Sequence, residues 1–108
     1  MQAEQRFANP GGTIQGGFLA AMADSAMAAS AVTANRGRKI HVTNIDIQVR
    51  YLSPARVGST LTCTARAVAP RRRVVFVEAE IVDDDGRLIA KAASTFIVTE
   101  REAAPVEP

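Results

Sequence analysis

Apolar and polar residues along the chain change their period once, near residue 37. Before this point, a run from Phe18 to about Ala34 is rich in alanine and other good helix formers, and Asn35-Arg36-Gly37 supplies signals that end a helix. After it, apolar residues recur at every second position, which is the period of a strand with one buried face. The pattern predicts one long helix followed by strands.

Short breaks with turn chemistry divide the second part of the chain into four strands. Ser53-Pro54 ends the first strand, Pro70 with the arginines that follow it ends the second, and Asp83–Gly86 predicts a hairpin turn before a last strand from about Leu88 to Thr99. One helix covered by a four-stranded antiparallel sheet is an α+β arrangement. The positions expected to face the core of the first three strands are Ile45, Ile47, Val49 and Tyr51; Leu61, Cys63, Ala65 and Ala67; and Val75, Val77, Ala79 and Ile81.

The two ends of the chain lack this regular pattern. Residues 1–8 predict an edge strand or an irregular lead-in. Residues 101–108 carry charges and two prolines, which predicts a disordered tail. The folded domain is therefore expected to comprise residues 1–100.

Composition excludes several classes of function. The chain has 108 residues, 47% hydrophobic and 22% charged, as in an ordinary single globular domain. A net charge of +2 is too small to indicate nucleic-acid binding. One cysteine and one histidine give no internal disulfide and argue against a zinc site, so no metal or cofactor is expected. No signal-peptide pattern opens the sequence, and a cytoplasmic location is expected.

The segment from Gly16 to Ala34 is apolar enough to require comparison with a membrane helix. Alanine dominates it, large apolar side chains are few, and it contains Asp24 and three hydroxyl residues. This composition falls short of a spanning helix, so the segment is interpreted as the buried helix of a soluble protein with no membrane partner.

Asp24 is the one charged side chain between Arg6 and Arg36. A lone carboxylate on an apolar helix costs stability unless it is paired, hydrogen-bonded or useful. Two interpretations stay open at this point. Asp24 is either a catalytic carboxylate or an ordinary acid on a solvent-facing stripe.

Gly16-Gly17 lies at the expected start of the same helix. Backbone N–H groups there have no partner inside the helix, and glycine lets a carbonyl oxygen approach them closely. Gly16 and Asp24 are eight residues apart, about 12 Å along a helix axis. One chain cannot hold both ends of a small reacting group over this distance, so a second copy is expected to supply the other half. A Gly-Gly pair alone is weak support, since most such pairs are turns.

Several motifs together resemble the phenylacetyl-CoA (PaaI-type) branch of the hotdog-fold thioesterases, and the match runs from Asn9 to about Thr99. The resemblance implies a hotdog fold, an acyl-CoA substrate, no cofactor, and a homodimer or a dimer-of-dimers tetramer with active sites between the central helices. The motifs are Asn9, Gly12-Thr13-Ile14-Gln15-Gly16-Gly17, Asp24-Ser25-Ala26-Met27, Tyr51-Leu52-Ser53-Pro54-Ala55-Arg56-Val57-Gly58, Asp85-Gly86-Arg87-Leu88-Ile89-Ala90 and Thr95-Phe96.

The resemblance also assigns roles to residues. The Gly16 N–H is expected to polarise the thioester carbonyl, and Asp24 of the opposite subunit to act as general base or nucleophile. Asn9 is expected to orient the water or the thioester. Further substrate-binding positions implied in this way, or suggested by charge for the phosphates of coenzyme A, are Gln15, Gly17, Thr43, Asn44, Arg56 and Arg72.

Two features depart from the family pattern. Gln15 stands where the family commonly has histidine, and glutamine cannot shuttle a proton near neutral pH. The N-terminal helix and first strand that are usual in the family are expected to be missing or reduced to residues 1–8. A hotdog dehydratase or hydratase normally needs a histidine together with a carboxylate, so the first departure disfavours that class of enzyme. Both departures leave open a non-catalytic acyl-CoA-binding module as the alternative to an acyl-CoA thioesterase.

Overall fold

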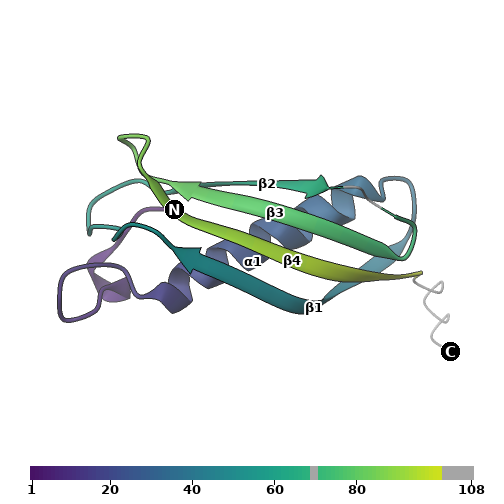
Figure 1. Cartoon of the computed structure of the whole chain (residues 1–108), viewed down its shortest axis with the longest axis horizontal. Coiled ribbons are helices and arrows are strands. Elements are labelled where there is room, and N and C mark those ends of the chain that lie inside the picture. The colour runs from purple at the N-terminus through teal and green to yellow at the C-terminus, as the bar shows by residue number, and fades with distance from the viewer. Residues whose placement is uncertain (69–70, 101–108) are drawn as a thin grey trace, which may run out of the picture.

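The computed structural model describes residues 1–68 and 71–100, in which one long helix lies along one face of a four-stranded antiparallel sheet (Figure 1). The predicted α+β hotdog architecture is confirmed. The strands are hydrogen-bonded in the order β1-β4-β3-β2, so β1 and β2 form the two edges. In chain order the elements are the 3₁₀ helix η1 (Gln5–Phe7), α1 (Gly16–Ala34), β1 (Ile40–Tyr51), β2 (Thr62–Val68), β3 (Val74–Val82) and β4 (Leu88–Glu100).

Helix α1 begins at Gly16, where the glycine pair predicted its start, and packs against all four strands. Its fully buried side chains recur at every fourth position, which forms one stripe along the helix. The helix is long and apolar enough to cross a membrane by length and composition alone, a test that core helices of folded domains also pass. Its interpretation as a core helix agrees with the buried stripe, which consists of Leu19, Ala23, Met27 and Ala31.

The predicted period of two is confirmed in the centre of the sheet. All four core-facing positions predicted for β3 are buried, and Phe96 of β4 is buried beside them. The hairpin between β3 and β4 turns at Asp83–Gly86, where Gly86 has φ +79° and donates its N–H to the Asp83 carbonyl (3.0 Å). A positive φ strains any residue with a side chain, which explains the glycine.

Strand β1 corrects one prediction. It begins at Ile40 rather than near Ile45, and its pairing with β4 shifts between Asn44 and Asp46. Ile45 is therefore the extra residue of a β-bulge, and its side chain is 66% exposed instead of buried. Ile47 and Tyr51 are also exposed, because β1 is an edge strand and no described element covers this part of it.

Residues 1–8 form neither a regular strand nor a free lead-in. Gln2 makes an isolated bridge with Thr60, and the Ala3 N–H donates to the Ser59 carbonyl (2.9 Å). Ala3 is buried, and η1 follows it. This segment thus covers the loop before β2. The predicted disordered tail, residues 101–108, lies outside the described residues.

Candidate functional site

The predicted carboxylate lies in the middle of α1 and is held by β1. Asp24 is half-buried, and its Oδ1 accepts a hydrogen bond from Asn44 Nδ2 (3.0 Å). Within residues 1–68 and 71–100 no other hydrogen bond or ion pair reaches this carboxylate. One oxygen is therefore fixed while the other is available to a ligand or water. This contact distinguishes Asp24 from a freely solvated acid, and its catalytic role stays a prediction.

The neighbouring strand residue does not join this contact. Successive side chains of a strand point to opposite faces, so Thr43 lies on the outer face of β1 when Asn44 points toward the helix. Thr43 is exposed and pairs with Ile97 of β4. Of the two candidate positions on this strand, the structure brings only Asn44 to Asp24.

The start of α1 presents two backbone donors, the N–H groups of Gly16 and Gly17, between two others that are already paired. The Gln15 N–H donates to the Phe7 carbonyl (2.9 Å), and the Phe18 N–H donates to the Gln15 carbonyl (3.1 Å). The N–H groups of Gly16 and Gly17 have no partner in the part of the chain that the structure describes. The Gln15 side chain is exposed and makes no cap hydrogen bond. The helix end thus offers adjacent free donors, as an oxygen-binding site requires.

Asn9 shapes the turn that precedes the helix. Its Oδ1 accepts hydrogen bonds from the N–H of Gly11 (3.0 Å) and of Thr13 (3.2 Å), and its Nδ2 donates to Thr13 Oγ1 (2.9 Å). Arg56 lies beside this turn through an isolated bridge with Thr13. The geometry shows Asn9 as a structural residue of the turn, and its part in orienting water or thioester stays a prediction.

A pocket of about 360 Å³ opens beside the helix start. Its walls are mostly apolar, and Ser53 is the one hydroxyl side chain among them besides Tyr51. Tyr51, the only tyrosine of the chain, was not predicted as a site residue; it was expected at a core-facing strand position and as the first residue of a family motif. The lining residues are Ile14, Gly16, Leu19, Tyr51, Leu52, Ser53, Pro54 and Ala55.

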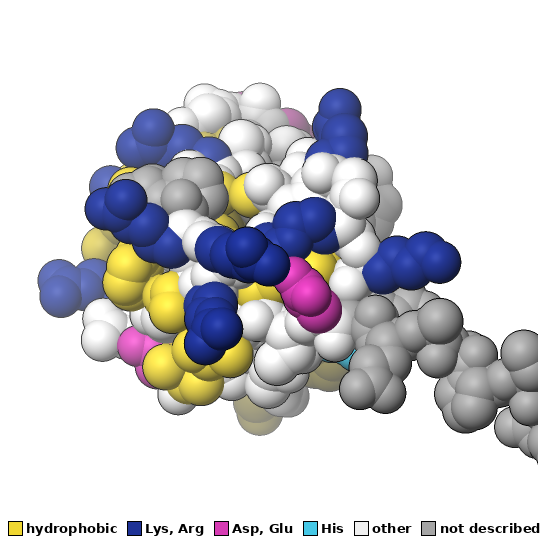
Figure 2. Space-filling model, turned by 90° about the vertical axis from the view of Figure 1, so that its right-hand side faces the viewer, with side chains coloured by type: hydrophobic (Ala, Val, Ile, Leu, Met, Phe, Trp, Pro, Cys, Tyr) yellow, Lys and Arg dark blue, Asp and Glu magenta, His cyan; other side chains and the backbone are white. Residues whose placement is uncertain are grey.

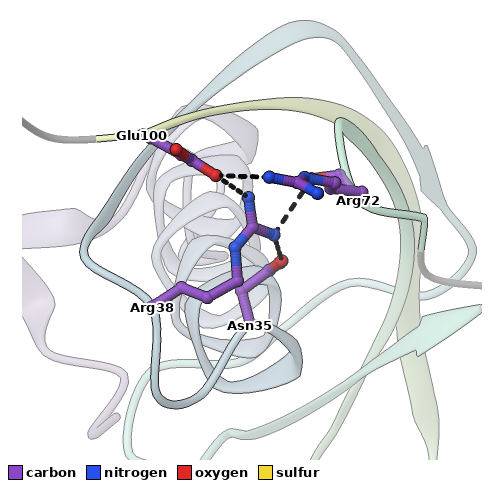
Figure 3. A network of polar contacts seen from close by, with 4 residues as sticks. All are labelled: Asn35, Arg38, Arg72 and Glu100. Atoms are coloured by element: carbon purple, nitrogen blue, oxygen red, sulfur yellow. Dashed lines mark hydrogen bonds and ion pairs between the residues drawn. The ribbon is translucent and has the colours of Figure 1, made fainter.

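The opposite end of the helix is basic (Figure 2). Arg38 and Arg72 both donate to Glu100 Oε1, at 3.1 and 3.0 Å, and Arg38 also donates to Asn35 Oδ1 (2.7 Å), as Figure 3 shows. Arg72 therefore lies at the end of α1 remote from Gly16, about 27 Å along the axis. The cationic residues of the two loops that meet here are Arg36, Arg38 and Lys39, and Arg71, Arg72 and Arg73.

This network gives Glu100 a pH-dependent contribution to stability. Hydrogen bonds from Arg72 and then Arg38 lower the pKa of Glu100 from 4.5. A carboxyl group whose pKa is lower in the folded than in the unfolded state stabilises the fold at pH values above its unfolded pKa. This contribution is lost as the pH falls through its folded-state pKa. We expect Glu100→Gln to lower Tm slightly near pH 7 and the difference to vanish in acid, measured by circular dichroism. Glu78→Gln, which removes a single longer pair with Arg66 (3.5 Å), is the control with the smaller difference.

A larger hollow of about 610 Å³ lies on the outer face of the sheet, away from α1. Four of its five charged side chains pair with one another: Lys91 lies 3.6 Å from Glu80, and Arg66 lies 3.5 Å from Glu78. Neither Asp24 nor the helix start borders it. Despite its size, it is therefore a solvent-facing sheet surface and not the candidate site.

Two other groups are explained by the fold. Burial raises the pKa of the Cys63 thiol, which leaves little nucleophilic thiolate and agrees with its interpretation as a packing residue. The carboxylates of Asp83, Asp84 and Asp85 lie close enough to hold a metal ion. However, Asp83 Oδ1 already accepts the N–H groups of Asp85 (3.0 Å) and Arg87 (2.8 Å), which form the hairpin turn.

Comparisons with known proteins agree with this arrangement. A model of the thioesterase superfamily matches residues 11–90. Mouse acyl-coenzyme A thioesterase 13 is 27% identical over 96 residues, which are 88% of this chain and 67% of that protein. Zebrafish thioesterase superfamily member 2 superposes with a TM-score of 0.83 at 25% identity, covering 92% of this chain and 71% of the other. The Escherichia coli PaaI protein has the same fold, with a TM-score of 0.81 at 22% identity over 92% of this chain and 69% of its own.

Proposed function

Since the chain belongs to the thioesterase superfamily, we propose that it hydrolyses acyl-CoA thioesters to a free acid and coenzyme A. The observation that carries the proposal is the half-buried Asp24 carboxylate, fixed through one oxygen by Asn44 and free at the other. The similarity to acyl-coenzyme A thioesterase 13 supports the same class of substrate. A carboxylate held in this way suits proton abstraction from water.

A complete site in this proposal combines two copies of the chain. Gly16 and Asp24 lie eight residues apart on one helix, about 12 Å along its axis, so they cannot both reach one thioester carbonyl. A two-fold axis that brings Gly16 of one copy to Asp24 of the other generates two identical sites. The resulting homodimer, alone or as half of a tetramer, is the assembly that we propose.

The free edge of β1 supports a second copy as the occupant of this side. The strand is twelve residues long and pairs with β4 on one side only. Ile45 is 66% and Ile47 40% exposed on it, and Val32 of α1 is 47% exposed. A long edge strand with exposed apolar side chains promotes aggregation unless another chain covers it.

The proposed reaction conserves atoms and charge in two steps. Asp24 takes a proton from water while the hydroxide forms a bond to the thioester carbonyl carbon, and the N–H groups at the helix start of the second copy stabilise the oxyanion. The C–S bond then breaks, and the thiolate of coenzyme A takes the proton from Asp24. Direct attack by Asp24 on the carbonyl carbon would instead break the C–S bond, release the thiolate of coenzyme A and form a mixed anhydride. Water would hydrolyse this anhydride to the free acid and Asp24, whose proton then passes to the thiolate.

Charge indicates how the coenzyme would be held. Arg56 is exposed beside the turn before α1, and Arg72 belongs to the basic end of the molecule. Guanidinium groups bind phosphate through charge-assisted hydrogen bonds. In the proposed dimer, the phosphates of one coenzyme A molecule would bind either Arg56 of one copy or the basic end of the other.

The test is thiol release from a panel of aryl and fatty acyl-CoA compounds. We expect hydrolysis of at least one class, because the pocket at the helix start is apolar. Light scattering on the same sample is expected to give the mass of two or four chains. Coenzyme A binding without turnover of any thioester would contradict the enzymatic proposal and favour the non-catalytic binding module. An active monomer would contradict the shared site.

A further inference from the structure

We propose that Tyr51 is a positioning residue for the oxygen-binding peptide at the start of α1, an inference that rests on the proposed thioesterase function. Tyr51 is the last residue of β1, and its hydroxyl donates a hydrogen bond to the Gly16 carbonyl (2.9 Å). The bond joins positions 35 residues apart in the sequence. It ties the end of an edge strand to the first peptide of the helix.

The Tyr51 ring occupies the space that the side chain of any residue other than glycine would need at position 16. A Cβ added there would be 2.9 Å from Cζ and 3.1 Å from both Cε1 and the hydroxyl oxygen of the ring. Atoms do not approach so closely without movement, so a side chain at position 16 would displace the Tyr51 ring from this contact. By contrast, a Cβ at Gly17 would meet nothing within 4 Å, which leaves room for a ligand on that side.

The hydrogen bond acts on a donor that the site uses. The Gly16 carbonyl and the Gly17 N–H belong to one peptide group. When a carbonyl accepts a hydrogen bond, the N–H of the same peptide becomes a stronger donor. Because the Gly17 N–H has no partner in the described residues, Tyr51 strengthens a free donor next to the Gly16 N–H. Oxyanion holes commonly use such pairs of donors.

Tyr51 therefore acts in two ways at the helix start. Its ring fixes the orientation of the Gly16–Gly17 peptide, and its hydroxyl polarises it. Together with Gly16, it also lines the pocket of about 360 Å³ at the helix start. The inferred chemistry is stabilisation of the negative charge on the thioester oxygen in the transition state.

Tyr51→Phe separates the two effects, because it keeps the ring and removes the hydroxyl. We expect kcat to fall roughly three- to tenfold with KM and Tm unchanged, as for one lost hydrogen bond in the transition state. Tyr51→Leu, which also removes the ring, is expected to lower kcat further. Phe76→Leu, at an exposed aromatic on the outer face of β3, is the control with wild-type kcat.

A second measurement does not depend on turnover. In the ¹⁵N-labelled protein, we expect the Gly17 amide proton to move upfield in Tyr51→Phe, while that of Gly86 stays in place. An unmoved Gly17 resonance would overturn the inference, and so would a raised KM with unchanged kcat, which would make Tyr51 a substrate contact. A wild-type protein inactive on all acyl-CoA compounds would refute the proposed function, whereas wild-type kcat in Tyr51→Phe would refute only this inference.

Discussion

Asp24→Asn is expected to lower kcat for acyl-CoA hydrolysis by about 10²- to 10⁴-fold, because the variant loses the group that accepts a proton from water. The fold should be retained, since the new side chain keeps an Oδ1 that can accept the bond from Asn44. Rates of thiol release at saturating substrate measure the loss, and coenzyme A binding by calorimetry tests that the site persists.

Ser25→Ala is the matched control for this variant. Ser25 is the next residue of α1 and is exposed, so wild-type activity is expected. If Asp24→Asn turned over thioesters as fast as Ser25→Ala, the carboxylate would have no catalytic role. If it lost activity together with coenzyme A binding and Tm, Asp24 would be a structural residue held by Asn44.

The sequence predicted the parts of the fold that depend on local pattern. Strand β3 alternates without interruption between buried apolar residues and exposed residues, of which two are glutamates and one is Phe76, and Asp83–Gly86 contains its own turn chemistry. The bulge at Ile45 could not be predicted in this way, because it depends on pairing with β4, about 50 residues later. Likewise, the bridge of Gln2 to Thr60 is a long-range contact that residues 1–8 do not encode locally.

The site was predictable where chemistry is unusual for its surroundings. Asp24 stands out as a lone charge on an apolar helix, and the glycine pair stands out at its start. Its hydrogen bond to Asn44 crosses from helix to strand, and only the family resemblance placed Asn44 near it. Tyr51 was missed because its role arises from contact with Gly16, 35 residues earlier. An exposed aromatic residue gives no local signal of such a contact.

Gly16→Ala is expected to lower both stability and activity, whereas Gly17→Ala should be tolerated by the fold. The methyl group at Gly16 would displace the Tyr51 ring, and because this ring is the outer end of a half-exposed side chain, we expect a cost at the lower end of the about 1–3 kcal/mol of core overpacking. At Gly17 the methyl group meets open space, and alanine is favoured over glycine in a helix by up to about 1 kcal/mol. Urea unfolding monitored by circular dichroism measures both changes.

A double variant identifies the cause of the loss. If the Gly16 methyl group destabilises the protein by displacing the Tyr51 ring, then adding Gly16→Ala to Tyr51→Ala should cost less than adding it to the wild type. The free-energy costs of the two substitutions would then be less than additive. Additive costs would mean that the methyl group acts elsewhere, for example on the turn between Asn9 and Thr13. Because removal of the ring also removes the contact that holds the Gly16–Gly17 peptide, kcat of the double variant should stay as low as in Tyr51→Ala, although its loss of stability is smaller than the sum of the two single losses.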